Sequence, residues 1–296
     1  MYFVDKRRAG YDCACIQTPA VIPFMSLIAD FSQQLAALIP TISTEKFSGQ
    51  LITLFKALLP VSDATIIHYP DTALPIIEYF EPGEDGSSHL DLFERGAFLL
   101  DPYYQAAATH RKFGFFQLGD LAPEGFLDSE YYKTFYHHSD YLDECGYLVA
   151  TTGDGFVNIS LARASDRAPF GKKQLQLLEE ISPLISQLCQ QHWDQPTEAQ
   201  QATQNLRGQL NAALGAFGSS LLTDRETQVI NLILHGHSTR TLADKLSISM
   251  ETVKLHRKHA YAKLGIGSQA ELFYLFLDSL MSARNYAGGD ALEAYL

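Results

Sequence analysis

Hydrophobic residues recur at helical spacing in two segments between residues 25 and 59. Their positions are Leu27, Phe31, Leu35 and Leu38 in the first segment, and Phe47, Leu51, Leu54, Phe55 and Leu58 in the second. Pro40 follows the first run and Pro60 follows the second. Because proline lacks the amide donor that a helix needs, the pattern predicts two separate amphipathic helices.

The pattern then changes to the alternation that is typical of strands. Residues 64–69 and 75–80 are short β-branched and aromatic runs separated by a turn that contains proline, which predicts a hairpin. Further strands are predicted at 113–118, 147–151 and 156–162. In the last of these, Val157, Ile159 and Leu161 alternate with Asn158, Ser160 and Ala162, as expected for a strand whose two faces differ.

Helices are predicted between these strands. Asp101 and Pro102 have the residue types of a helix cap and a first helical position. Another helix is predicted over 129–141, and a long one over 171–192 with a kink at Pro183. Paired helices, a hairpin, a helical middle, a closing hairpin and a long helix together predict an α+β sandwich.

The segment from residue 222 to residue 280 contains start and stop signals for four short helices. Thr223 and Glu226, like Ser268 and Glu271, have the spacing of a capping box. Two further serines, Ser238 and Ser249, are candidate caps for the second and third helices, and glycines at 236 and 265 end the first and third.

The third of these helices is predicted to have two unlike faces. Val253, Ala260 and Leu264 share one face and suit packing on the preceding helices. The opposite face carries Lys254, Arg257, Lys258 and Tyr261. A short capped helix, a tight turn and a second capped helix with a cationic face predict a helix-turn-helix whose second helix fits a major groove.

The charge distribution supports this interpretation. Residues 221–283 hold 7 Lys and Arg against 6 Asp and Glu, whereas the rest of the chain holds 15 against 28, within a whole-chain net charge of −12. An acidic remainder repels the phosphate backbone, so DNA binding has to depend on the one small cationic face. A solvated face on an ordinary three-helix unit is the alternative.

The residues of this segment resemble the LuxR/FixJ-type (GerE-like) DNA-binding domain, which has the pattern L-T-x-R-E, V, G, an aliphatic-Ala pair, S-x-x-T-V-K and K-L-G. The resemblance covers the last fifth of the chain. It implies that Lys254 and Leu255 reach base edges and that Lys258 lies against DNA. It also leaves four candidate phosphate contacts, namely Arg257, Thr252, Arg225 and Ser238.

The same resemblance implies scaffold roles for Glu226, Gly236, Val253 and Leu264. The fourth helix exposes more apolar surface than a small unit can cover, and in the family this helix forms the dimer. Two-fold symmetry then implies double-stranded DNA with an inverted-repeat operator, whose half-sites lie about one DNA turn apart.

The front of the chain resembles GAF/PAS-type sensor domains. Its segments DPYYQAA, FGFFQLGDL, SEYY and GFVNISLAR are similar to the sensor half of some proteobacterial LuxR-type regulators. The predicted fold is therefore α+β, a GAF/PAS-like α/β sandwich sensor domain followed by an all-α four-helix LuxR-type domain. The predicted boundaries are a flexible extension over 1–24, a sensor domain over 25–193, a linker over 194–219, a DNA-binding domain over 220–283 and a tail over 284–296.

Aromatic residues crowd the middle of the sensor domain, which suits a small-molecule site of apolar walls and a few polar groups. The candidate ligand-binding residues are Asp101, Tyr104, Phe116, Tyr132 and Tyr136. The rings also suit a plain hydrophobic core. The acyl-homoserine-lactone branch of the family shares an Asp-Pro pair but anchors its lactone with tryptophans, and the one tryptophan of this chain is Trp193. A lactone receptor and a ligand-independent dimerising domain stay open as alternatives to an unidentified small-molecule effector.

Other functions find little support in the sequence. The acidic pair of a phosphoacceptor receiver domain is missing after the first strand, and nucleophile, P-loop and dinucleotide motifs are absent, so we expect neither an enzyme nor a cofactor. The His137-His138-x-Asp140 segment is a poor metal site because adjacent helical histidines diverge. Cys13-x-Cys15 is a weak metal or redox signal. No apolar run has the length of a membrane span, and we expect a cytoplasmic homodimer in which Met25, rather than Met1, is a candidate translation start.

Overall fold

The computed structural model describes residues 24–71, 73–81, 93, 96–136, 141–194, 206–282 and 289–292. Its front half is built on a five-stranded antiparallel sheet with strand order β2-β1-β5-β4-β3. The strands are β1 (Asp63–Tyr69), β2 (Ile76–Phe80), β3 (Gly114–Gln117), β4 (Tyr141–Ala150) and β5 (Phe156–Ala164). The predicted hairpin is confirmed, with Thr65 opposite Phe80.

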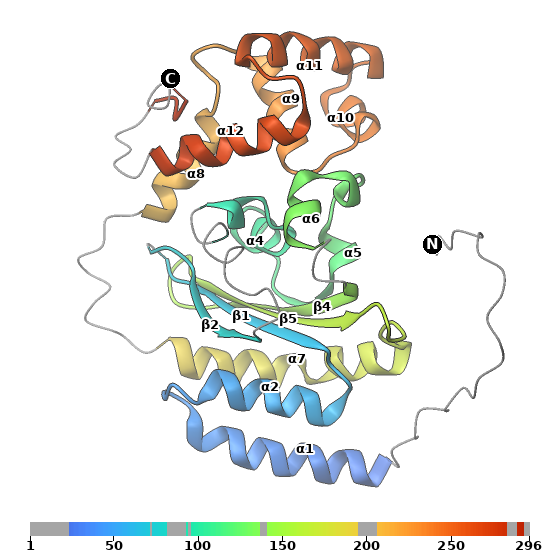
Figure 1. Ribbon diagram of the computed structural model, residues 1–296. Helices are drawn as coiled ribbons and strands as arrows, with labels where there is room; N and C mark the ends of the chain where they lie inside the picture. Colours follow the sequence, from blue (N-terminus) through green and yellow to red (C-terminus); the bar gives the residue numbers. More distant parts are fainter. Residues whose placement is uncertain are drawn as a thin grey trace, which may run out of the picture.

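Helices cover both faces of this sheet (Figure 1). On one face lie α2 (Phe47–Leu58) and α7 (Lys172–Trp193), and α1 (Phe24–Leu38) packs outside α2, to which the 3-10 turn η1 (Ile39–Thr41) connects it. On the other lie η2 (Ala97–Leu100), α4 (Pro102–Ala108), α5 (Leu118–Leu121), η3 (Phe126–Asp128) and α6 (Glu130–Phe135). The predicted α+β sandwich is confirmed.

The second half is all helical. It consists of α8 (Leu206–Ala216), α9 (Asp224–Leu234), α10 (Thr239–Leu246), α11 (Met250–Leu264) and α12 (Gln269–Ser282). The four helices predicted from their caps correspond to α9–α12. These helices stand on the α4–α6 side of the sheet, as Figure 1 shows. One continuous apolar core joins the two halves and contains Phe98 and Tyr104 from the first half together with Leu210 and Phe276 from the second.

The prediction of a helix over 129–141 is wrong at its end. The helix α6 stops at Phe135, and Tyr141 already pairs with Ala164 of β5. Because backbone pairing with a distant strand outweighs local helical preference, β4 begins six residues before the strand predicted from residue 147. Residues 137–140, which include His137, His138 and Asp140, lie outside the described residues.

Two segments are more ordered than the sequence predicts. The sequence predicts a linker over 194–219, yet this range contains α8, whose Leu210, Ala213 and Leu214 are buried. Part of the predicted tail is also buried: Asp290 accepts hydrogen bonds from the amides of Gly218 (2.8 Å) and Ser220 (2.9 Å). The predicted extension over residues 1–23 and the Cys13-x-Cys15 signal lie outside the described part of the chain.

Candidate DNA-binding surface and effector site

The helix α11 is held in position by caps at both of its ends. Before it, Ser247 adopts a left-handed conformation with φ of +54°, and the hydroxyl of Ser249 accepts a hydrogen bond from the amide of Thr252 at 3.0 Å. At its end Gly265 has φ of +68°, a conformation that glycine adopts without a steric cost. The tight turn fixes the angle at which α11 follows α10.

The two faces of α11 differ as predicted. Val253 and Ala260 are buried, whereas Lys254, Leu255, Arg257 and Lys258 are exposed, Leu255 by half of its surface. Leu264 is half-buried on the packed side, and Thr252 is half-buried. Tyr261 departs from the prediction, because it is half-buried against the core rather than on the outer face. We call the exposed residues Lys254, Leu255, Arg257 and Lys258 the basic face.

One lysine of the basic face is paired within its own helix. The ammonium of Lys254 lies 2.7 Å from the carboxylate of Glu251, three residues before it, and both side chains are exposed. An exposed ion pair of this kind contributes little to stability. The lysine can therefore leave its partner for a stronger acceptor at small cost.

Glu226 ties the start of α9 to the end of α11. Its carboxylate accepts a hydrogen bond from the amide of Thr223 at 2.9 Å and lies 2.6 Å from the ammonium of Lys263. The hydrogen bond from Lys263 lowers the pKa of Glu226 to about 2. Hydrogen bonds from Thr223 lower this pKa further, whereas burial raises it. The predicted scaffold position of Glu226 is consistent with this geometry. Arg225 is exposed beside it, and its guanidinium donates to Gln228 at 2.8 Å.

Ser238 faces the sensor domain. Its hydroxyl caps α10 by accepting from the amide of Thr241 at 3.2 Å, and its own amide donates to the carbonyl of Glu124 at 2.7 Å. The Thr241 hydroxyl donates to the Glu124 carboxylate at 3.0 Å. In this arrangement a candidate phosphate contact is engaged by the other half of the chain.

Two glycines allow this approach of backbone to backbone. Gly125 has φ of +97°, and a Cβ atom there would lie 2.8 Å from the amide nitrogen of Ser238 and 3.0 Å from the carbonyl oxygen of Gly236. Gly236 has φ of +80°, and a Cβ atom there would lie 3.2 Å from the Cβ of Ser129. The α9–α10 turn and the η3–α6 segment therefore pack more closely than side chains permit.

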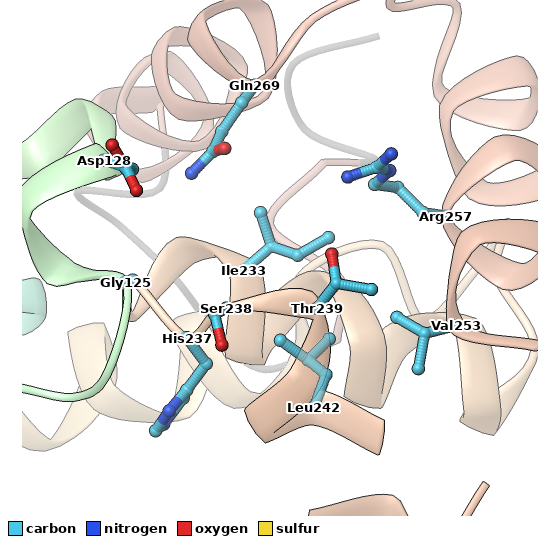
Figure 2. Close-up of a pocket in the computed structure, with 11 residues that line it drawn as sticks. Gly125, Asp128, Ile233, His237, Ser238, Thr239, Leu242, Val253, Arg257 and Gln269 are labelled. Atoms are coloured by element: carbon cyan, nitrogen blue, oxygen red, sulfur yellow. The ribbon is translucent and has the colours of Figure 1, made fainter. Parts of the chain in front are cut away.

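A cleft of about 230 Å³ opens beside this contact. Figure 2 shows Arg257 pointing from α11 toward the space that Gln269 and Asp128 also face. Both halves of the chain line it, and Val253 and Leu242 form part of its wall. Of the four residues of the basic face, Arg257 is the one that lines this cleft.

The apolar side of α12 is covered within this chain. Leu272, Phe273, Phe276, Leu277 and Leu280 are all buried. Contacts come from α6, α8 and α9, and a Cβ atom on Gly96 would lie 2.9 Å from Cδ1 of Leu280. The expectation that α12 leaves an apolar surface for a dimer is therefore wrong for this side. Its exposed side carries Tyr274, which is 54% exposed.

The second candidate site lies in the sensor domain around Asp101. This residue caps α4, where one carboxylate oxygen accepts from the amide of Tyr104 at 3.0 Å and the other from the hydroxyl of Tyr131 at 2.9 Å. Burial raises the pKa of Asp101, and hydrogen bonds from Tyr104, Tyr131 and Tyr136 oppose that rise. Three of the predicted ligand-binding residues, Asp101, Tyr104 and Tyr136, are thus brought together.

The other two predicted residues lie at its margin. Phe116 is half-buried on the edge strand β3, opposite Gly146. Tyr132 is half-buried and stacks on Tyr136 with ring centroids 5.6 Å apart. The rings of Tyr69 and Phe98 pack directly against Tyr104, as the alternative of a hydrophobic core predicts.

Sequence reasoning missed a second buried carboxyl group at this site, that of Glu144. Burial and the negative charge of Asp101 raise the pKa of Glu144 to about 8, while hydrogen bonds from Ser160 and Tyr136 oppose that rise. The strand was predicted to start at residue 147, so Glu144 fell outside it. Alternation extended backwards from Leu148 would have placed Glu144 on the inner face.

Metal chemistry has no support in the described part of the chain, where no group of three or more His, Cys, Asp or Glu has the arrangement of a metal site. Cys145 and Cys189 are buried free thiols, and burial raises the pKa of both. Within the same residues, no helix is both long and apolar enough to cross a membrane.

The helices α10 and α11 and the tight turn between them form a helix-turn-helix, and its second helix carries the exposed basic face. Residues 220–276 match the family of bacterial regulatory proteins of the luxR type. A putative HTH-type transcriptional regulator in the exeN 3' region of Aeromonas salmonicida is 38% identical over 190 residues, which cover 62% of this chain and 96% of that protein. The chain therefore belongs to the luxR family of helix-turn-helix transcriptional regulators.

Other relatives match less of the chain. The oxygen regulatory protein NreC of Staphylococcus aureus is 38% identical over 52 residues, which cover 18% of this chain and 24% of NreC. Among solved structures, the LBD domain of VqsR from Pseudomonas aeruginosa is 27% identical in sequence, with a TM-score of 0.48. The match covers 55% of this chain and 95% of the VqsR chain. SdiA of Escherichia coli is 16% identical in sequence, with a TM-score of 0.41. The match covers 85% of this chain and 98% of the SdiA chain.

Proposed function

We propose that this chain is a cytoplasmic, homodimeric and non-enzymatic transcriptional regulator in which a small-molecule effector, bound in the sensor domain, controls how α11 meets DNA. The observation that carries the proposal is the basic face of α11, whose four residues are exposed while Val253 and Ala260 behind it are buried. A rigid helix with one anchored and one cationic side is the geometry that major-groove recognition needs.

The DNA contacts follow from the positions on α11. Lys254 and Leu255 lie four and five residues after the first residue of α11, in its second turn, and are proposed to reach base edges. Lys258 and Arg257 continue the basic face, with Lys258 lying along the duplex and Arg257 on a phosphate. Thr252 at the start of α11 and Arg225 at the start of α9 are further phosphate contacts, since helix N-termini favour anions.

Ser238 is proposed to contact phosphate only after the two halves separate. Its amide donates to the Glu124 carbonyl in the present arrangement, and Arg257 faces the same cleft. An effector that favours separation of these halves would thus free part of the DNA-binding surface, as a shift between two populated arrangements. A dimer through α12 would use the side that carries Tyr274, because the opposite side is buried.

The effector site is proposed to include Asp101, Tyr104 and Tyr136, with Phe116 and Tyr132 at its margin. Support comes from its position: α4, which Asp101 caps, is joined to α8 by a hydrogen bond from Asn211 to the hydroxyl of Tyr104 at 2.8 Å. A ligand that moves Asp101 therefore acts on a helix that contacts the DNA-binding half.

The test begins with a duplex selected from a random library by the full chain. Fluorescence anisotropy then gives the affinity of the full chain for the selected duplex and for random DNA. The measurement is repeated with each compound that raises the thermal unfolding midpoint of the chain in a metabolite screen. We expect specific binding to an inverted repeat and at least one compound that changes its affinity. Binding of equal strength to both duplexes would overturn the proposed function. Specific binding without any responsive compound would favour a regulator whose sensor domain only dimerises.

A further inference from the structure

Two buried carboxyl groups of the sensor domain, those of Asp101 and Glu144, are close enough for the charge of one to act on the other. Asp101 is 5% exposed at the start of α4, and Glu144 is 7% exposed on β4. Cys145 and Tyr147 belong to the core shared with α2 and α7. Because side chains alternate along a strand, Glu144 points to the opposite face of the sheet, which α4 and α6 cover.

The charged groups that act on Glu144 are acidic. Asp101 and Asp63 both raise its pKa, and hydrogen bonds from Ser160 and Tyr136 do not compensate for burial. The rings that feel its charge are those of Tyr103, Tyr131 and Tyr136. Burial of a carboxylate is costly unless a positive group or several donors accompany it. This site therefore lacks a positive partner among the described residues that act on it.

Three oxygen atoms at this face have no hydrogen-bond partner within the described part of the chain. They are Oε2 of Glu144, Oδ1 of Asn158 and the hydroxyl of Tyr103. Asn158 is connected to Glu144 through Ser160, to which its amide donates at 3.4 Å. Each of the three atoms is able to accept a hydrogen bond, and buried polar atoms of this kind are usually paired.

We propose that the effector is a small organic cation, a primary amine, whose ammonium group is held by Glu144 and Asn158 between the rings of Tyr103, Tyr131 and Tyr136. The three N–H donors of an ammonium match the three unpartnered oxygens, and tyrosine faces attract a cation. The inference rests on the function proposed above and assigns the chemical class of its effector. Glu144 supplies the charge that distinguishes an amine from a neutral analogue.

Proton release follows from this assignment. With a pKa of about 8, Glu144 carries a proton in most free molecules at pH 7. The ammonium favours the ionised carboxylate, so binding releases a proton and strengthens as pH rises from 7 towards 8. Asp101 and Asp63 face Glu144 with the same sign of charge, and raised tyrosine pKa values keep Tyr103, Tyr131 and Tyr136 neutral in this range.

The experiment uses matched probes and the full chain. Hexylamine, hexanol, hexanoate and N-hexanoyl homoserine lactone are titrated at pH 7 by isothermal calorimetry, in two buffers of different ionisation enthalpy, together with a series of primary amines from methylamine to phenethylamine. We expect an amine to bind at least about tenfold more tightly than the matching alcohol, with release of a proton. Hexanoate should bind least.

Two variants locate the effect. Glu144→Gln should remove the preference for the amine over the alcohol and the proton release, while circular dichroism and thermal unfolding report that it is folded. Asp143→Asn is the matched control, because Asp143 is the neighbouring carboxyl on β4 and accepts a hydrogen bond from the amide of Phe170 at 2.9 Å. It should retain the preference.

Several outcomes would overturn the inference. They are equal binding of amine and alcohol, an unchanged preference in Glu144→Gln, and no binding by any amine of the series at millimolar concentration. A neutral ligand, the lactone included, that binds and alters DNA affinity would overturn the amine assignment while leaving the proposed function in place. Failure of specific DNA binding would instead overturn the proposed function.

Discussion

The side-chain amide of Asn211 donates a hydrogen bond to the hydroxyl of Tyr104 at 2.8 Å. Tyr104 is fully buried in α4 of the sensor domain, and its backbone amide donates to Asp101. Asn211 belongs to α8, which contacts α12 of the DNA-binding half. This hydrogen bond therefore joins the candidate effector site to α8 and, through α8, to α12 of the DNA-binding half.

This bond gives the first prediction. Tyr104→Phe keeps the ring and the hydrogen bond from the backbone amide to Asp101. It removes the hydroxyl that accepts the hydrogen bond from Asn211. We expect the effect of the effector on DNA affinity to fall by about 1 kcal/mol, the usual contribution of one hydrogen bond. Asn211→Ala should give a similar loss, and the double variant should add little to either one. Additive losses would show that the two side chains act separately.

The second prediction concerns Lys254 on the basic face. Lys254→Ala should weaken binding to the selected duplex by about 1–3 kcal/mol, the range for a side chain that hydrogen-bonds a base. Anisotropy against selected and random duplexes measures the effect. Lys172→Ala, an exposed lysine on α7, is the control and should leave both affinities unchanged. Equal loss on both duplexes would assign Lys254 to the phosphate backbone.

The third prediction tests the packing of the two halves. Gly125→Ala places a methyl group against the backbone of Ser238 and Gly236, and it strains a left-handed conformation by about 1–3 kcal/mol. We expect a lower unfolding midpoint and stronger DNA binding without effector, because the contact that engages Ser238 is weakened.

Gly114→Ala is the matched control for this variant. Gly114 has φ of +126°, and nothing lies within 4 Å of the added methyl group. It therefore introduces backbone strain without disturbing the contact between the halves, and it should lower stability without raising DNA affinity. If Gly125→Ala and Gly114→Ala changed DNA affinity equally, the packing of Gly125 on the α9–α10 turn would not control DNA binding.

The fourth prediction is a pH dependence of stability. The pKa of Glu226 is lowered from 4.5 to about 2 in the folded chain, so the ionised carboxylate stabilises the fold above pH 4.5. That contribution is lost as pH falls from 4.5 towards about 2, through the folded pKa. The unfolding midpoint of the native chain should fall more steeply in this window than that of Glu226→Gln. Glu251→Gln, which removes an exposed carboxylate, should follow the native curve, and parallel curves for all three would refute the assignment.

The sequence predicts the DNA-binding half better than the sensor half, for a physical reason. Helix caps are local: Thr223, Ser238 and Ser249 each satisfy an amide within three residues, so their spacing alone locates α9, α10 and α11. The start of β4 at Tyr141 depends instead on pairing with Ala164, which no local pattern encodes. Glu144 was missed for that reason.

Contacts between the two halves were equally hidden. The sequence of α12 alone predicts an apolar surface without a partner. In the folded chain Gly96 of the sensor domain packs against Leu280 on this side of α12. The spacing of Leu210, Ala213 and Leu214 was a signal for α8, but the surrounding composition indicated a linker. The role of Gly125 depends on a distant turn, which its own neighbours in the sequence do not reveal.

The salt dependence of DNA binding tests the central claim most directly. The logarithm of affinity for the selected duplex is plotted against the logarithm of salt concentration for the native chain and for a variant with Lys254, Arg257 and Lys258 all replaced by alanine. We predict loss of specific binding, with a slope shallower by about one for each phosphate contact removed. An unchanged affinity and slope would contradict the assignment of α11 as the helix that enters DNA.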